Sequence, residues 1–120
     1  MTDLLDFSFP KSSRLLDSKS YSAVFNNAQK IGGRFLLLLY RETDRLSPPR
    51  LGIIVAKKNV RRAVARNRIK RLVRESFRLH QHQLMACDIV VLAMKGVDTL
   101  TNAEIVVELG KKWQRLVKSS

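Results

Sequence analysis

The sequence predicts an α+β fold, a two-layer sandwich in which helices pack on a small mixed sheet. Three short apolar runs with flanking turn residues are typical of buried strands, and the run at 51–57 is almost continuously apolar. Between and around these runs lie segments with apolar residues at helical spacing. No repeat and no long Pro-, Gly- or Ser-rich stretch divides the 120 residues. We therefore expect one domain that spans residues 1–120.

The predicted element order is helix, strand, strand, helix, strand, helix. The elements are an irregular lead-in at 1–13, a helix at 17–27, strands at 34–42 and 51–57, a helix from 61 to about 82, a strand at 88–95, a helix at 102–117 and a tail at 118–120.

The first half of the chain has one helical face and two strands. Tyr21, Val24, Phe25 and Ala28 recur at i, i+3, i+4 and i+7, which places them on one face of the first helix. Asp17 or Ser18 could cap its start. Paired glycines at 32–33 open the first strand, and paired prolines at 48–49 lie in the loop before the second.

The second half contains two helices around one strand. In the long helix, a spacing of about 100° per residue places one set of side chains toward the sheet. This set is Ala65, Ile69, Leu72, Val73, Ser76 and Phe77. In the last helix Ile105, Leu109 and Trp113 form the core stripe, and Thr101 with Glu104 predicts a capping box.

Charge is the unusual property of this chain. Its 23 Lys and Arg exceed its 10 Asp and Glu, which leaves a net charge of +13. Self-repulsion of this size is usually offset by a polyanion, and nucleic acid is favoured over an anionic membrane surface.

The longest apolar run, residues 35–40, is far shorter than the roughly 20 residues that span a bilayer. The N-terminus has no basic segment typical of a signal peptide, and the single Cys87 forms no internal disulfide, so we expect a cytoplasmic protein.

The basic residues concentrate in the segment 57–78, which has ten of them and one acid, Glu75. Asn67, Arg71, Arg74 and Arg78 fall on the helix face opposite the sheet. Like charges at i+3 and i+4 destabilise a helix, so this stripe indicates an anionic partner. Arginine suits phosphate because its planar fork meets two oxygens at once and also stacks on bases. A solvated basic face without a partner is the alternative.

One motif within this segment is specific. The stretch Ala65–Arg74 (ARNRIKRLVR), preceded by Val55-Ala56-Lys57-Lys58, resembles the RNR signature of the bacterial ribonuclease P protein family. Residues 9–25, 52–55 and 88–91 resemble the family's first helix, central strand and later strand. The resemblance implies a fold like the second domain of ribosomal protein S5, with a left-handed β-α-β crossover. It also implies the protein subunit of a ribonucleoprotein in which a catalytic RNA, using Mg²⁺ ions held mainly by the RNA, removes the 5′ leader of precursor tRNA.

The resemblance implies two sets of binding residues and no catalytic side chain in the protein. Residues expected to contact the catalytic RNA are Lys57, Lys58, Arg61, Arg62, Arg66, Asn67, Arg68, Lys70, Arg71 and Arg74. Residues expected to line a cleft for the precursor tRNA leader are Arg14, Tyr21, Phe25, Phe35 and Leu39. For Tyr21 and Phe25 a core role is the alternative, because aromatic pairs at i,i+4 usually face a core. The protein is expected to be monomeric without RNA.

Other functions have less support in the sequence. His80, His82 and Cys87 lack the spacing and the fourth ligand of a zinc site, so no metal is expected. The acids are dispersed, which argues against a protein-only nuclease. Trp113 and Cys87 are expected to be structural. A ribosomal or ribosome-assembly protein that binds rRNA, with no processing role, is the alternative function.

Overall fold

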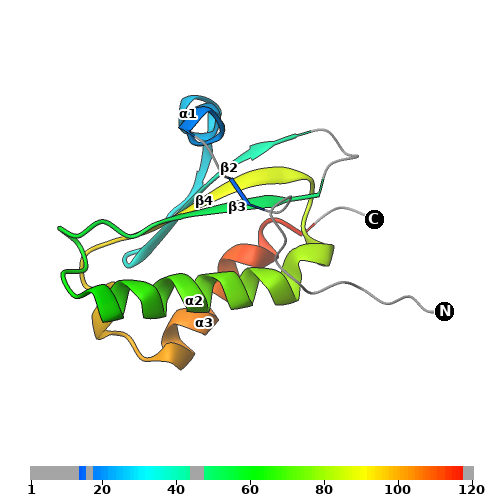
Figure 1. The fold of residues 1–120 in the computed structure, drawn as a ribbon. Helices are drawn as coiled ribbons and strands as arrows, with labels where there is room; N and C mark the ends of the chain where they lie inside the picture. Colours follow the sequence, from blue (N-terminus) through cyan, green and yellow to red (C-terminus); the bar gives the residue numbers. More distant parts are fainter. Residues whose placement is uncertain (1–13, 16–17, 44–47, 118–120) are drawn as a thin grey trace.

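A computed structural model describes residues 14–15, 18–43 and 48–117. The predicted lead-in at 1–13, the candidate cap Asp17 and the tail at 118–120 lie outside this part. The helices are α1 (Ser18–Asn27), α2 (Ala63–His80) and α3 (Asn102–Gln114), with short 3-10 helices at Gln81–Gln83 and Val97–Thr99. The strands are β1 (Gln29–Ile31), β2 (Leu36–Glu42), β3 (Arg50–Ile54) and β4 (Cys87–Ala93). Figure 1 shows their arrangement, which confirms the α+β fold.

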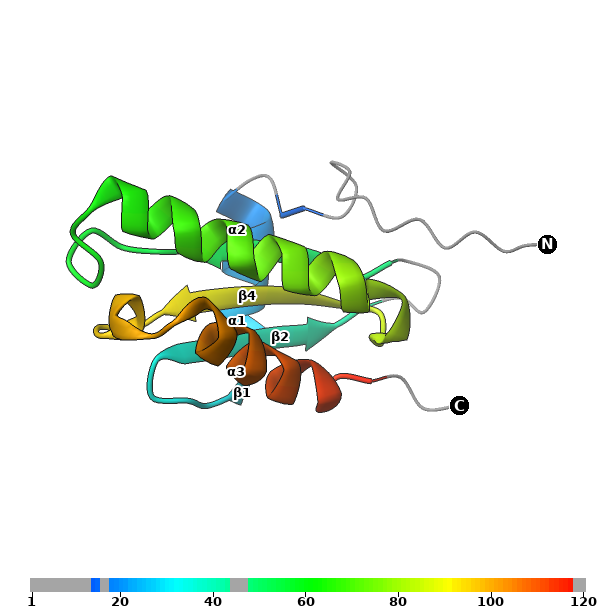
Figure 2. The same cartoon turned by 90° about the horizontal axis from the view of Figure 1, so that it is seen from below.

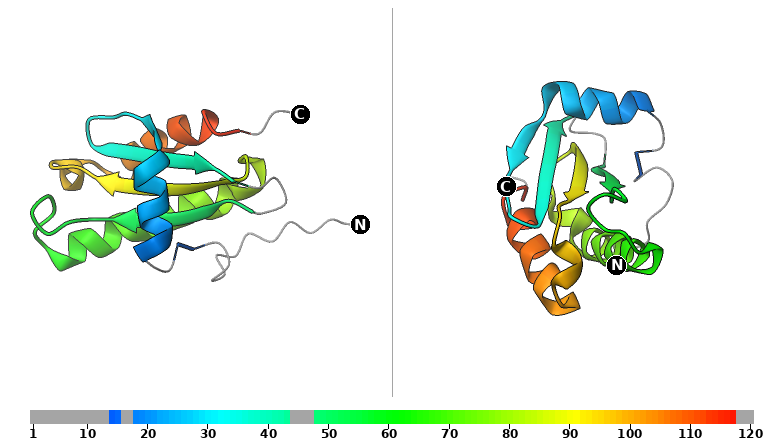
Figure 3. Two further views of the ribbon diagram at one scale, coloured as in Figure 1. Left: turned by 90° about the horizontal axis from the view of Figure 1, so that it is seen from above. Right: turned by 90° about the vertical axis from the view of Figure 1, so that its left-hand side faces the viewer.

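The four strands form one mixed sheet in the order β1-β2-β4-β3. β4 lies inside the sheet, antiparallel to β2 and parallel to β3. Six of the seven residues of β4 are buried, as expected for a strand covered on both faces. The parallel strands β3 and β4 are joined through α2, and Figures 2 and 3 show this crossover to be left-handed, whereas most such crossovers are right-handed.

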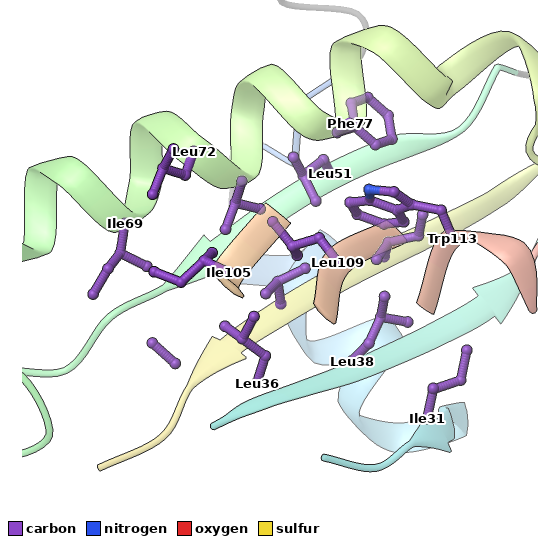
Figure 4. Close-up of a cluster of buried hydrophobic side chains, with 14 of the residues drawn as sticks. Ile31, Leu36, Leu38, Leu51, Ile69, Leu72, Phe77, Ile105, Leu109 and Trp113 are labelled. Carbon is purple, nitrogen blue, oxygen red and sulfur yellow. The ribbon is translucent and has the colours of Figure 1, made fainter. Parts of the chain in front are cut away.

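The helices cover both faces of the sheet. α2 and α3 lie on one face, and α1 crosses the strands on the other (Figures 1 and 3). The larger core, between the sheet and the helix pair, includes Phe77 and Trp113, whose rings meet edge to face at 5.9 Å (Figure 4). Trp113 Nε1 donates a hydrogen bond of 2.7 Å to the buried Ser76 Oγ, so the polar atoms between the helices satisfy each other. Trp113 is therefore structural, as predicted.

A smaller core lies under α1. It consists of Leu15, Val24, Leu39 and Val90, with Tyr21 among the half-buried side chains packed against it. The alternation of β2 divides its leucines between the two cores, since Leu36 and Leu38 face the helix pair and Leu37 and Leu39 face α1.

Of two local features, the capping box of α3 was predicted from the sequence and the strand β1 was not. The capping box of α3 is confirmed, because the Thr101 side chain accepts from Glu104 N at 3.1 Å and Thr101 N donates to Glu104 Oε1 at 2.9 Å. β1 was not predicted. Its three residues are too few for a periodic signal, and it forms by pairing with β2 across the turn at 32–35.

A buried carboxylate ties three strands together at the start of β4. Asp88 is 1% exposed, and both of its oxygens accept from Arg50, at 2.8 Å from Nε and 2.7 Å from Nη2. Arg41 Nη2 lies 3.8 Å from the same carboxylate. Arg41 and Arg50 are the register partners of Asp88 on β2 and β3, so the cluster fixes the alignment of all three strands.

Cys87 is buried at the first position of β4, which agrees with its predicted structural role, although the strand begins one residue earlier than predicted. Its burial and the negative charges of Asp88 and Glu42 raise the pKa of its thiol from 9.0 to about 12. We expect iodoacetamide to modify this thiol slowly in the folded protein near neutral pH and rapidly in denaturant, because only the thiolate reacts. Alkylation of the folded chain at the rate of a free cysteine would contradict this.

The same pKa shift predicts a dependence of stability on pH. The pKa is higher in the folded than in the unfolded state, so the protonated thiol stabilises the fold below pH 9. This contribution is lost as the pH rises from 9 toward 12. The free energy of unfolding of the unmodified protein, measured relative to Cys87→Ala, should therefore fall with rising pH in that range. A constant difference would contradict it.

Candidate nucleic-acid interface

α2 has two chemically different faces, as the sequence predicted. Ile69, Leu72, Val73, Ser76 and Phe77 are buried toward the sheet. On the other side the exposed residues of the predicted stripe are Asn67, Arg71 and Arg74, while Arg78 is half-buried. Glu75 is the only acid within the helix.

The exposed arginines of α2 have little support from the protein itself. Within the described residues, the side chain of neither Arg71 nor Arg74 forms a hydrogen bond or an ion pair. Two exposed guanidiniums three residues apart repel each other, which costs a few tenths of a kcal/mol in an isolated helix. An array of phosphates would outweigh this repulsion, because each charged N–H group would gain an anionic acceptor.

The loop that enters α2 continues the basic surface. Lys57 and Lys58 are exposed in a turn, and Arg61 and Arg62 are exposed directly before the helix. Asn59 holds this loop against the sheet, because its Nδ2 donates to Ala93 O at 3.1 Å. The loop therefore has a fixed anchor beneath its charges.

The first turn of α2 favours anions for a second reason. The N-cap residue Arg62 makes no capping hydrogen bond with its side chain, and the first turn contains no acid. Backbone N–H groups without helical partners point outward from this end, which is also the positive end of the helix dipole. Cations here oppose the dipole, so the loop and the helix end together would bind a phosphate more readily than either alone.

Two other predicted contact residues make hydrogen bonds inside the protein. Arg66 Nη1 donates to Val60 O at 3.1 Å and to Arg61 O at 2.7 Å, which closes the loop onto the helix. Arg68 bonds to the segment that enters α3, through Asn102 and the carbonyl of Leu100. Their positive charges remain at the interface, but part of each guanidinium is committed to the fold.

A hollow of about 340 Å³ lies between α1, the edge strand β3 and α2. Its lining residues are Arg14, Leu15, Tyr21, Leu51, Gly52, Ile53, Lys70 and Arg74. Arg14 reaches this position because residues 14–15 pair with β3, through a bridge to Leu51 and a bond of 3.0 Å from Leu15 N to Leu51 O. The structure thus brings Arg14 and Tyr21, predicted for the leader cleft, together with two basic residues predicted for the catalytic RNA.

The remaining predicted cleft residues do not line this hollow. Phe25 is 45% exposed, which excludes the alternative that it is a core residue of the described chain. Leu39 is 6% exposed and packs under α1. Phe35 lies elsewhere, beside Gly96 and in a second hollow that it shares with Leu100 and α3.

Gly52 forms part of the floor of the first hollow and was not among the predicted residues. A Cβ atom built at Gly52 would lie 2.6 Å from three atoms of the Tyr21 side chain, two in the ring and the hydroxyl oxygen, so only glycine lets this side chain approach the strand so closely. A glycine inside an apolar strand is a known sign of close approach, but sequence alone does not say what approaches.

The residues that could bind metal do not gather. Among the described residues, no group of three or more His, Cys, Asp or Glu side chains has the geometry to hold an ion. His80 Nδ1 lies 2.7 Å from Ser76 O, within its own helix. In the same part of the chain, no helix is both long enough and apolar enough to cross a membrane.

Comparisons with known proteins agree with these features. The family model described as Ribonuclease P matches residues 9–117. A ribonuclease P protein component of Chromohalobacter salexigens is 53% identical over 94% of this chain and 88% of the relative, and one of Proteus mirabilis is 48% identical over 93% of each. The solved structure of the Staphylococcus aureus RNase P protein has a TM-score of 0.82 and 27% identity, and the match covers 90% of this chain and 100% of that one.

Proposed function

Because this chain belongs to the ribonuclease P family and is a protein component of that tRNA-processing ribonucleoprotein, we propose that α2 and the loop before it bind the ribonuclease P RNA. The observation that supports this site is the row of exposed basic side chains without acidic partners. The row consists of Lys57, Lys58, Arg61, Arg62, Arg71 and Arg74, with Asn67 between them. The alternative of a ribosomal or assembly protein has no support in these comparisons.

We further propose that the hollow beside β3 receives the 5′ leader of precursor tRNA. Tyr21 offers an aromatic face on which an unpaired base can stack, and stacking tolerates any base sequence. Arg14, Lys70 and Arg74 surround it with positive charge for the backbone phosphates. Because Lys70 and Arg74 belong to α2, the leader would lie next to the catalytic RNA.

The protein in this proposal binds and positions, and the RNA performs the chemistry. The acids of the described chain are either exposed and scattered or, like Asp88 and Glu108, paired with basic side chains. Mg²⁺ would be held by the RNA, where its hydrated form suits phosphate oxygens. The protein is proposed to be monomeric without RNA, and its expected cytoplasmic location remains a prediction.

Reconstitution tests the whole proposal. Purified ribonuclease P RNA at limiting Mg²⁺ should cleave precursor tRNA much faster when this protein is added, because bound cations offset phosphate repulsion. The protein without the RNA should release no leader. Cleavage by the protein alone, or an unchanged rate with the RNA, would contradict the proposal.

A substitution of Tyr21 tests the leader site separately. Loss of one stacking partner should weaken binding of leader-containing precursor tRNA to the holoenzyme by roughly tenfold, and leave mature tRNA binding unchanged. Phe35→Ala is the matched control, since it removes an aromatic ring from the other hollow. If Tyr21→Ala lost the same affinity for precursor tRNA and for mature tRNA, Tyr21 would be a core residue and would not bind the leader.

A further inference from the structure

We propose that Arg68 is a positioning residue, which with Asn102 forms a bracket that sets the rotation of α2 about its own axis. This inference rests on the proposed binding of RNA by α2. It separates the basic residues of the helix into those that face the RNA and those that hold the helix in place.

The bracket joins segments that are far apart in the sequence. Arg68 Nε donates to Asn102 Oδ1 at 2.6 Å, and Arg68 Nη2 donates to Leu100 O at 2.5 Å. These acceptors lie 34 and 32 residues further along the chain. Two bonds from one planar group fix both the position and the direction of the guanidinium, which a lysine could not do.

The acceptors are themselves held firmly. Thr101, which lies between them, is the N-cap of α3 and closes the capping box with Glu104. Leu100 N donates to Val97 O at 3.1 Å, so the segment before the cap is also bonded. Arg68 therefore binds a rigid part of the protein, and a small rotation of α2 would break both of its bonds.

The opposite side of the same helix turn has a second restraint. Arg66 bonds to the carbonyls of Val60 and Arg61, and so ties α2 to the entering loop. With the helix held at Arg66 and Arg68, Asn67, Arg71 and Arg74 are directed outward. The direction of these side chains matters because misaligned arginines lose their hydrogen bonds to phosphate and keep only their long-range attraction.

Asn102→Ala provides the sharpest test because it changes no charge. If the bracket positions α2, this variant should bind ribonuclease P RNA roughly fivefold more weakly, with the same dependence on salt as the unmodified protein. Gln114→Ala is the matched control. It removes an exposed side-chain amide from α3, the helix to which Asn102 belongs, and it should bind ribonuclease P RNA normally. Urea unfolding of each variant should confirm that all are folded under the binding conditions.

Arg68→Ala and the double variant complete the cycle. Asn102→Ala should have little further effect in the Arg68→Ala background, because the two residues act through one contact. Unchanged or tighter RNA binding by Asn102→Ala would overturn the proposal. Loss of the hydrogen bond between Arg68 and Asn102 would then have no effect on the affinity or would raise it. An equal loss in both backgrounds would also overturn it, because Asn102 would then act on the RNA independently.

The same binding series distinguishes failure of the bracket from failure of the proposed function. Arg71→Ala, measured in parallel, should lower both the affinity and its salt dependence. A normal Arg71→Ala variant would remove α2 from the RNA interface. A weakened Arg71→Ala variant with a normal Asn102→Ala variant would leave the interface intact and remove only the bracket.

Discussion

The Arg71→Ala/Arg74→Ala double variant is expected to bind ribonuclease P RNA roughly a hundredfold more weakly, since hydrogen bonds to charged groups contribute about 1.5–3 kcal/mol each. Both side chains are exposed and lack hydrogen bonds within the described chain, so their removal should leave the stability of the fold nearly unchanged. The plot of log affinity against log salt should become shallower by about two, one for each phosphate that is no longer neutralised. Binding titrations at several salt concentrations measure both effects.

The control for this variant removes the same charge elsewhere. Lys30 on β1 and Lys111 on α3 are exposed and belong to other elements than α2 (Figure 2). The Lys30→Ala/Lys111→Ala variant should therefore bind with nearly normal affinity and salt dependence. Equal losses in the two double variants would show that net charge, and not the face of α2, determines the affinity.

Asp88→Ala should lower the free energy of unfolding by about 3 kcal/mol, because it leaves the buried side of two arginines without their carboxylate. Removal of one partner from a buried ion pair costs about 3–5 kcal/mol. The side chains of Arg50 and Arg41 are each more than one-third exposed and can turn partly to water, so the expected value is at the lower end. Denaturant unfolding followed by circular dichroism measures the change.

Asp98→Ala is the control for Asp88→Ala. Asp98 is an exposed acid within the short 3-10 helix Val97–Thr99, and its removal should change stability by no more than about 0.5 kcal/mol. If Asp88→Ala were as stable as Asp98→Ala, the cluster of Asp88 with its arginines would contribute nothing to the alignment of the strands.

The features that sequence predicted well depend on neighbours along the chain. The two faces of α2 follow from a single periodicity, so every predicted core position from Ile69 to Phe77 is buried. The capping box at Thr101 needs only a partner three residues away. The specific RNR-like motif also lies within one helix, which is why the family could be identified from it.

The features that sequence did not predict depend on contacts between distant residues. The ion pairs of Asp88 with Arg41 and Arg50 were not predicted, because only strand register brings these residues together. Arg68 resembles its basic neighbours in sequence, and only the packing of α2 beside α3 shows where its guanidinium points. Leu39 and Phe35 were assigned to one cleft, and strand alternation alone would place them on the same face. They are separated because β2 begins at Leu36, so Phe35 lies in the turn before the strand and packs on the side of α3.

The position of β4 also determines when the sheet can be completed during synthesis. β2 and β3 do not pair with each other, and both must wait for β4. Until residue 93 has left the ribosome, the nascent chain can close only the short β1–β2 hairpin and its helices. The basic helix α2 is made before the strand that completes its sheet, so the emerging polycation lacks this sheet for about a dozen residues of elongation, between His80 and Ala93. It lacks its helical partner α3 for longer, because α3 ends only at Gln114.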